Sequence, residues 1–342
     1  MMRVLHVIDK LDVGGAEKVF LDLTHLLANS TIEIGALLFD DSGALTSKMD
    51  ARVTLYRLKR TNKYSLIKLL ALHKISSKYD IVHAHMRHVY RYVRLAQLIF
   101  GGKYKLVLHD HYGIDQDIPT SVKGIFKPRY YIGVCTSLTD WAKSKLGIPS
   151  DNVYTLANTI IPTATSKYTS SSRSGNAIMV ANISRVKNIS FAIDLCGRTS
   201  RHLDIYGQSR DEAYRTELQR QIANNPKVRI IDDVTDFSGL YNRYDLAIHS
   251  SMSESGPLVL LEYLAAGIPF IAYKTGEVAA TVYNDLPMLF MNSFNIDEWI
   301  NKIEEIRVIE DLPEKMRMVF NKYFSTEKYT SECLRIYERI DC

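Results

Sequence analysis

The chain has 342 residues, 46% of them hydrophobic and 24% charged, with a formal net charge of +5. This length favours two domains, and the composition is that of a soluble globular protein, which excludes fibrous and disordered classes. The charge is uneven, because residues 1–165 hold 22 Lys and Arg against 14 Asp and Glu (+8), whereas residues 166–342 hold 21 against 24 (−3).

Short apolar runs and helical periods alternate through the first half of the chain. The strands predicted there cover residues 3–8, 34–39, 53–58, 81–85, 105–109, 131–135 and 153–156. Helices are predicted around residues 19–27, 66–72, 95–99 and 138–146. A stretch rich in Ser and Thr, residues 163–175, then indicates a domain boundary.

The second half repeats this alternation. Its predicted strands cover residues 177–181, 201–206, 228–231, 246–249 and 269–273. Its predicted helices cover residues 188–196, 213–223, 237–241, 257–266, 296–309, 313–323 and 326–340. Strands that alternate with helices imply parallel sheets, so we expect two facing, doubly wound α/β domains with a ligand site in the cleft between them.

Cysteine usage and hydropathy favour a cytoplasmic protein. Cys135, Cys196, Cys333 and Cys342 have neither disulfide-framework nor zinc-site spacing. The N-terminal apolar run is too short for a signal peptide, and the weakly charged residues 256–273 are too few for a membrane span.

Three basic clusters interleaved with aromatic residues account for much of the positive charge of the first half. They are Arg57, Lys59, Arg60, Lys63 and Tyr64; Tyr90, Arg91, Tyr92 and Arg94; and Lys123, Lys127, Arg129, Tyr130 and Tyr131. One interpretation is a solvated face; another is peripheral contact with an anionic membrane or a lipid-diphosphate acceptor. No recognition motif supports nucleic acid as a partner.

The most informative segment is SESGPLVLLEYLAAGIPFIAY, residues 253–273. Glu254 and Glu262 enclose a Gly256-Pro257 loop and the start of an apolar helix. A helix start can hold a phosphate, and an acid further along can hold a sugar hydroxyl. On spacing alone, the alternative is that Glu254 caps the helix and Glu262 pairs with a buried base.

The E-x7-E pattern of this segment resembles the signature of family 4 retaining glycosyltransferases of the GT-B fold. The resemblance implies that Glu254 lies near the transferred sugar, that Glu262 holds the ribose, and that Gly256, Pro257 and Leu258 meet sugar and phosphates. It also implies an N-terminal acceptor-side domain over residues 1–163, a donor-binding domain over 164–323, and a helix over 324–342 that packs back on the first domain.

Two upstream segments extend the resemblance. Val180 to Asn188 (VANISRVKN) is similar to the strand-end motif whose cations hold the donor diphosphate, which implies this role for Lys187 and Arg185, although Asn182 stands where the family has its Arg. Gly14-Gly15-Ala16-Glu17 matches the family's glycine-rich loop and assigns Gly15 to donor binding.

Histidines crowd the first half, with His83/His85 and His109/His111 as two His-x-His pairs. Side chains two residues apart in a strand share one face, so the pairs could supply four zinc ligands. We favour the interpretation without metal. The resemblance implies that His109, or else His111, hydrogen-bonds the transferred sugar, and that His85 lines the acceptor side.

The sequence therefore predicts a retaining, metal-independent glycosyltransferase without a cofactor. Its donor would be a UDP- or GDP-sugar, UDP being the commoner choice in the family. Its acceptor would be an envelope polysaccharide, lipopolysaccharide or lipid-linked glycan. The alternatives are a nucleotide-sugar epimerase of the same architecture, a binding-only module, and a metal hydrolase built on the histidines.

Overall fold

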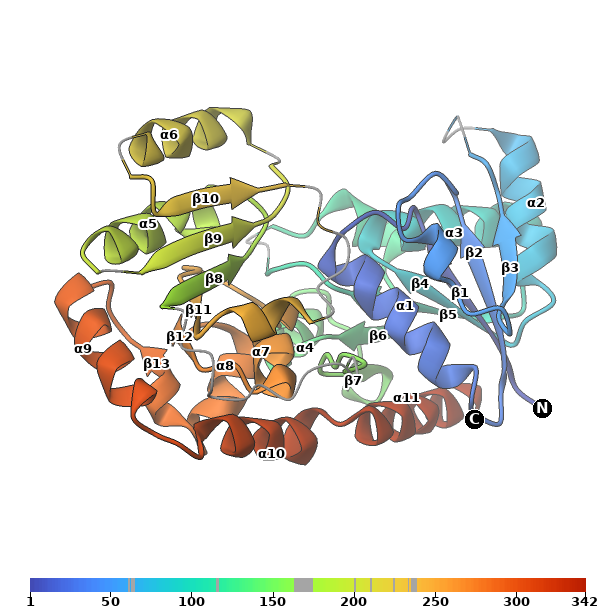
Figure 1. The fold of residues 1–342 in the computed structure, drawn as a ribbon. Helices are drawn as coiled ribbons and strands as arrows, with labels where there is room; N and C mark the ends of the chain where they lie inside the picture. Colours follow the sequence, from blue (N-terminus) through green and yellow to red (C-terminus); the bar gives the residue numbers. More distant parts are fainter. Residues whose placement is uncertain are drawn as a thin grey trace. The chain divides into compact units, whose positions relative to one another are not determined.

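The computed structural model describes residues 1–60, 62, 65–114, 117–162, 175–199, 201–209, 211–223, 225–232, 234 and 239–342. The chain forms two compact units: unit 1 is Met1–Thr159 with Thr326–Cys342, and unit 2 is Ile160–Ser325 (Figure 1). The linker predicted at 163–175 lies outside the described residues except for its last residue, and so do Lys63 and Tyr64 of the first basic cluster.

Unit 1 is built on a parallel sheet whose described strands have the order β3-β2-β1-β4-β5-β6-β7. The strands are β1 Arg3–Ile8, β2 Glu33–Leu38, β3 Thr54–Arg57, β4 Ile81–His85, β5 Lys105–Asp110, β6 Tyr130–Gly133 and β7 Val153–Thr155. The helices are α1 Gly15–Leu27, α2 Leu66–Ser76, α3 Arg87–Phe100, α4 Thr136–Ser144 and α11 Thr326–Asp341. The strand order reverses between β1 and β4.

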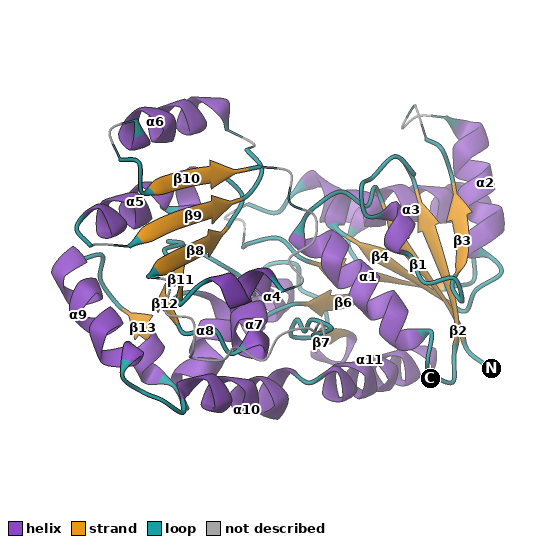
Figure 2. Cartoon of the chain, in the orientation of Figure 1, coloured by secondary structure: helices purple, strands orange, loops and turns teal. Residues whose placement is uncertain are grey.

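Unit 2 repeats this plan with the order β10-β9-β8-β11-β12-β13 (Figure 2). Its strands are β8 Asn176–Val180, β9 His202–Tyr206, β10 Val228–Ile231, β11 Leu246–His249, β12 Phe270–Tyr273 and β13 Phe290–Met291. Its helices are α5 Ile189–Gly197, α6 Glu212–Ile222, α7 Leu258–Ala266, α8 Gly276–Tyr283, α9 Ile296–Arg307 and α10 Leu312–Phe324. The order reverses between β8 and β11. The predicted pair of doubly wound parallel-sheet domains is thus confirmed.

The C-terminal helix α11 belongs to unit 1 because one stripe of it is apolar. Its buried residues recur every three or four positions, as expected for an amphipathic helix, and they join the core of unit 1. They are Tyr329, Cys333, Ile336, Tyr337 and Ile340. None of the described helices is both long enough and apolar enough to cross a bilayer.

The tyrosines of the basic clusters do not contribute to an exposed surface. Tyr90, Tyr92, Tyr130 and Tyr131 are all buried in the core of unit 1. Arg60 lies over the rings of Phe39 and Tyr92 at 4.6 Å from each centroid. The predicted interleaving of cations with aromatic side chains on a membrane-facing surface is wrong for these tyrosines, because burial of large rings stabilises the core.

Helix α8 and strand β13 of unit 2 were not predicted. Strand β13 spans only two residues, too few to show a period. The helix predicted at 237–241 falls partly outside the described residues, and the structure has a 3-10 helix at Leu240–Arg243.

A layer of five histidines lies on one face of the unit 1 sheet. His6 on β1 is in register with His83 on β4, and His85 at the end of β4 is in register with His109 on β5. His111 follows just beyond β5. The first four are completely buried, and His111 is partly buried. Residues two apart in a strand share a face, which explains why both His-x-His pairs contribute to one layer.

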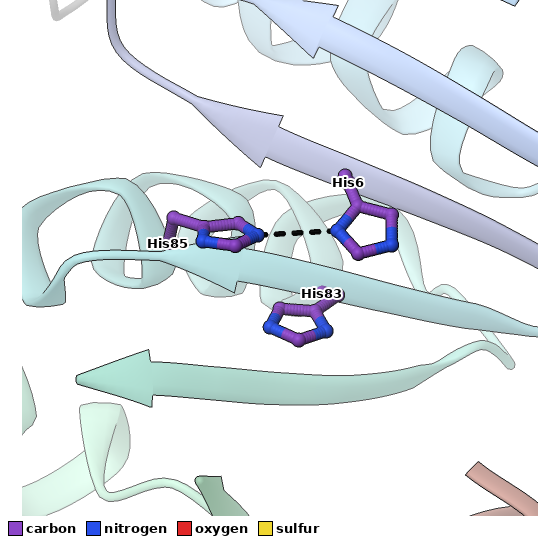
Figure 3. Close-up of side chains that lie close together, drawn as sticks. All are labelled: His6, His83 and His85. Carbon is purple, nitrogen blue, oxygen red and sulfur yellow. Dashed lines mark hydrogen bonds between the residues drawn. The ribbon is translucent and has the colours of Figure 1, made fainter. Parts of the chain in front are cut away.

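The hydroxyl of Tyr337 on α11 is the centre of the hydrogen bonds in this layer. Its Oη lies 2.7 Å from His83 Nδ1 and 3.2 Å from His6 Nε2. His6 Nδ1 in turn lies 3.1 Å from His85 Nε2, so the two rings meet edge to edge (Figure 3). The last helix of the chain is therefore joined by polar contacts to the middle of the sheet.

Burial keeps the histidine layer uncharged. It lowers the pKa of His6 to about 3 and that of His111 to about 3. It also lowers the pKa of His83, His85 and His109 well below the usual value, with neighbouring histidines adding to the effect. All five rings are neutral at physiological pH.

Replacing Tyr337 with Phe should destabilise unit 1 by about 1–3 kcal/mol, because two buried ring nitrogens lose their partner. Tyr329→Phe on the same helix is the matched control, since the buried Tyr329 hydroxyl has no hydrogen-bond partner in the described structure. Urea unfolding followed by Trp141 fluorescence in a Trp299→Phe background reports on unit 1. Equal losses in the two variants would contradict this account.

Unit 1 should unfold in mild acid before unit 2. The folded pKa values lie below about 6.5, the unfolded value, so the unfolded chain takes up protons that the folded layer does not. Stability is therefore complete above about pH 6.5 and falls as the pH drops below that value, with each of the five histidines contributing to the loss. In metal-free buffer, Trp141 fluorescence should change at a higher pH than that of Trp299; a shared transition would contradict the prediction.

Candidate active site

Two loops of unit 2 meet where its strand order reverses. Residues 181–188 follow β8, and residues 250–257 follow the neighbouring strand β11. In open parallel sheets, the crevice outside the carboxyl ends of the strands at this reversal is where ligands bind. The loops are tied together, since the Met252 amide donates to the Val186 carbonyl at 2.8 Å and Ser250 Oγ donates to the Asn188 carbonyl at 2.9 Å.

An ion pair between Lys187 and Glu254 connects these loops. Lys187 Nζ donates to Glu254 Oε1, and His249 Nε2, at the end of β11, lies 3.4 Å from the same oxygen. The Lys187 side chain is 23% exposed and that of Glu254 is 12% exposed, so both remain partly accessible. The structure therefore brings together two residues that lie 67 positions apart and were both predicted as site residues.

Glu254 is a carboxylate at neutral pH. Burial by itself would raise its pKa, but the hydrogen bond from His249 and the positive charge of Lys187 outweigh burial and lower the pKa to about 2. A group with this pKa accepts hydrogen bonds and does not serve as a proton donor near pH 7.

The turn after β12 holds Glu254 in place, a role that was not predicted from the sequence. The Thr275 hydroxyl oxygen accepts a hydrogen bond from the Glu254 amide at 3.3 Å, and the Glu277 amide donates to the Ser255 carbonyl at 2.8 Å. Gly276 has φ of +82°, and a Cβ there would lie 3.1 Å from Glu254 atoms. Both the left-handed backbone and the close approach require glycine. In the sequence, the Gly276-Glu277 dipeptide after the strand was the feature that could have indicated this turn.

Helix α7 begins directly beside the ion pair. Pro257 is its N-cap and offers no side-chain capping hydrogen bond, and Leu258 is its first residue. Gly256, just before the helix, is partly exposed. Such a helix start favours an anion through its partial positive charge and its amide groups.

Glu262 lies further along α7, partly buried, and accepts a hydrogen bond from the hydroxyl of Tyr241. The adjacent Tyr263 hydroxyl accepts a hydrogen bond from the Val180 amide at 3.2 Å, which fixes α7 against the end of β8. The sequence had left open that Glu254 caps the helix and that Glu262 pairs with a buried base. In the structure, Glu254 pairs with Lys187 of the other loop, and Glu262 contacts the Tyr241 hydroxyl.

Arg185 is placed differently from Lys187. Its guanidinium forms two hydrogen bonds to Glu217 of α6, at 2.9 and 2.6 Å, and lies over the Tyr214 ring at 5.0 Å from its centroid. Its side chain is 58% exposed. A role in diphosphate binding would require it to leave Glu217, so Lys187 is the better-placed cation.

The remaining predicted site residues belong to unit 1. Gly15 is the first residue of α1, beyond the end of β1. His85 and His109 lie in the buried histidine layer, whereas His111 is partly exposed. Of the two histidines predicted to meet the sugar, His111 is therefore the more accessible.

Comparisons with known proteins agree with this plan. Residues 163–323 match the family model described as Glycosyl transferases group 1, and residues 13–163 match the one described as Glycosyltransferase Family 4. A search of curated proteins gave no match.

Solved structures share the fold at low sequence identity. Alr3699/HepE of Anabaena, solved with UDP and glucose, is 16% identical with a TM-score of 0.80 over 99% of this chain and 100% of that chain. A glycosyltransferase from Rickettsia africae is 16% identical with a TM-score of 0.77, over 99% and 98% of the two chains. Sucrose-phosphate synthase from Thermosynechococcus elongatus is 15% identical with a TM-score of 0.76, over 99% of each chain. Together, the two adjoining family matches and this two-sheet fold show that the chain is a GT-B glycosyltransferase of the family 4 kind.

Proposed function

We propose that the chain moves a hexose-type sugar from a nucleotide diphosphate sugar to a glycan or lipid-linked acceptor of the cell envelope, with retention of anomeric configuration. UDP is the first choice of carrier, with GDP second. Structurally similar proteins favour UDP, since HepE was solved with UDP-glucose and TarM with UDP. The envelope acceptor is favoured by WaaB, described as a lipopolysaccharide outer core galactosyltransferase.

The observation that carries this proposal is the Lys187–Glu254 pair beside the start of α7. A departing nucleoside diphosphate carries negative charge that grows as the bond to the sugar breaks. A fixed cation and a helix N-terminus stabilise that charge most where it develops, which lowers the barrier without requiring a metal.

Each residue then has a distinct task. Lys187 binds the diphosphate, together with amides at the start of α7. Glu254, held as a carboxylate, accepts hydrogen bonds from hydroxyls of the transferred sugar, and Glu262 accepts them from the ribose. Arg185 supplements Lys187 when it is released from Glu217.

Retention follows from front-side attack in this proposal. The acceptor hydroxyl approaches the face of the sugar that the diphosphate leaves, and the departing phosphate oxygen accepts its proton. No side chain of unit 2 is assigned as a general base, which agrees with the low pKa of Glu254. Unit 1 would supply the acceptor side and, through His111 or His109, a hydrogen bond to the sugar.

Glu254→Gln should lower kcat about 100- to 1,000-fold while UDP affinity is retained, because the amide keeps the shape but loses the charge that orients the sugar. Release of UDP from UDP-sugars measures kcat, and calorimetry measures UDP binding. Glu314→Gln, at an exposed position of α10, is the control. A binding-only module would show no turnover in either protein, and an unchanged kcat in the Glu254→Gln protein would exclude the proposed role.

Lys187→Met should weaken UDP binding about 10- to 100-fold, as expected for loss of a hydrogen bond to a charged group, and should leave uridine binding nearly unchanged. The difference between the two ligands isolates the diphosphate. Calorimetric titration with UDP and with uridine checks this directly. If both ligands lost affinity equally, Lys187 would support the fold of the loop and not the diphosphate.

A further inference from the structure

Three histidines at the carboxyl ends of β4 and β5 direct ring nitrogens toward one another. His85 Nδ1 lies 3.1 Å from His111 Nε2. One nitrogen from each of His85, His109 and His111 can be chosen so that all three lie within 4.8 Å of one another. Neither nitrogen of the buried His109 has a hydrogen-bond partner in the described structure. A buried polar group without a partner is costly, which points to a ligand that is bound there.

A second set, His6, His83 and His85, meets the same distance limit and shares His85 with the first (Figure 3). A neutral imidazole has one nitrogen lone pair, so His85 can serve only one set at a time. The His6 set is wholly buried. The set that includes the partly exposed His111 is the one an ion can reach from solvent.

We propose that His85, His109 and His111 bind one borderline divalent transition-metal ion, with Zn²⁺ the first choice. Imidazole nitrogen is a preferred ligand of zinc, and the neutral form that burial maintains is the form that coordinates. At Zn–N distances of about 2.0–2.1 Å, tetrahedral ligands lie about 3.4 Å apart. The His85–His111 pair, at 3.1 Å, is already close to this separation, and a His109 nitrogen lies within 4.8 Å of the other two, so His109 is the ring that has to move closer.

The remaining histidines supply the outer support that metal-bound histidines require. With His85 Nδ1 on the metal, its Nε2–H donates to His6 Nδ1, 3.1 Å away. His6 Nε2–H then donates to Tyr337 Oη at 3.2 Å, and the Tyr337 hydroxyl donates to His83 Nδ1 at 2.7 Å. Every hydrogen bond in this series has one donor and one acceptor, so metal binding selects a single set of tautomers.

This site differs from the interpretation favoured on sequence grounds, in which the histidines hold no metal. The ion is not a cofactor of the proposed transfer, whose charge stabilisation comes from unit 2. It ties β4 to β5 and, through Tyr337, to α11. Because it takes the nitrogens assigned to sugar contact, zinc and sugar compete, and zinc is expected to lower transfer.

Calorimetric titration of the EDTA-stripped full chain with Zn²⁺ tests the proposal without any donor sugar, so its outcome is independent of the proposed function. A Cys342→Ser background removes the exposed thiol. We expect one Zn²⁺ per chain. His111→Ala should lower the affinity for Zn²⁺ more than about 100-fold. Tyr337→Phe should lower it about 10- to 100-fold, as is typical when a residue that supports a metal ligand is replaced. The control His202→Ala, at an exposed position of β9, should bind as the parent does.

Thermal unfolding gives a second readout, since an ion that binds only the folded state raises its stability. Zn²⁺ should raise the midpoint reported by Trp141 and not that reported by Trp299. Absence of a complex with one Zn²⁺ per chain would overturn the site, as would equal affinity of the His111→Ala and His202→Ala proteins. Unchanged affinity in Tyr337→Phe would overturn the supporting role of the hydrogen-bonded series.

Discussion

The ion pair between Lys187 and Glu254 is the constraint on which the candidate active site of unit 2 depends. A partly buried charge is tolerated only when it is paired and hydrogen-bonded, so each residue requires the loop that carries the other. His249, at the end of the strand before Glu254, and the turn with Thr275 and Gly276 complete the arrangement. Three segments distant in sequence, around Lys187, His249–Glu254 and Thr275–Gly276, thus converge beside the start of α7, and in the proposed function an incoming diphosphate would meet charge that is already oriented.

The architecture could be predicted because its signals are local and repeated. A run such as RVLHVI at β1 carries apolar residues on both faces, as expected for a strand buried on both sides, and helical periods separate successive strands. The order of the strands could not be predicted from the sequence, because it depends on which strands, distant along the chain, pair with each other. Strand β13 was missed because two residues carry no period, and Tyr90 and Tyr131 were misread as surface groups because a Tyr beside a cation looks the same in sequence whether buried or exposed.

The candidate site was harder to predict from the sequence than the fold. Resemblance selected Lys187 and Glu254, and their mutual contact came only from the structure. The resemblance also selected Arg185, whose described partners are Glu217, Asp211 and the Tyr214 ring. The histidine pairs showed a shared face, but not that β1 and α11 would add His6 and Tyr337 to the same hydrogen-bonded layer, since those contacts join residues up to 331 positions apart.

A crystal structure of the chain with UDP tests the central claim most directly. The account predicts the diphosphate beside Lys187 and the amides at the start of α7, with the ribose hydroxyls on Glu262. Diphosphate density away from the ends of β8 and β11, with the Lys187–Glu254 pair unaltered and uncontacted, would contradict it.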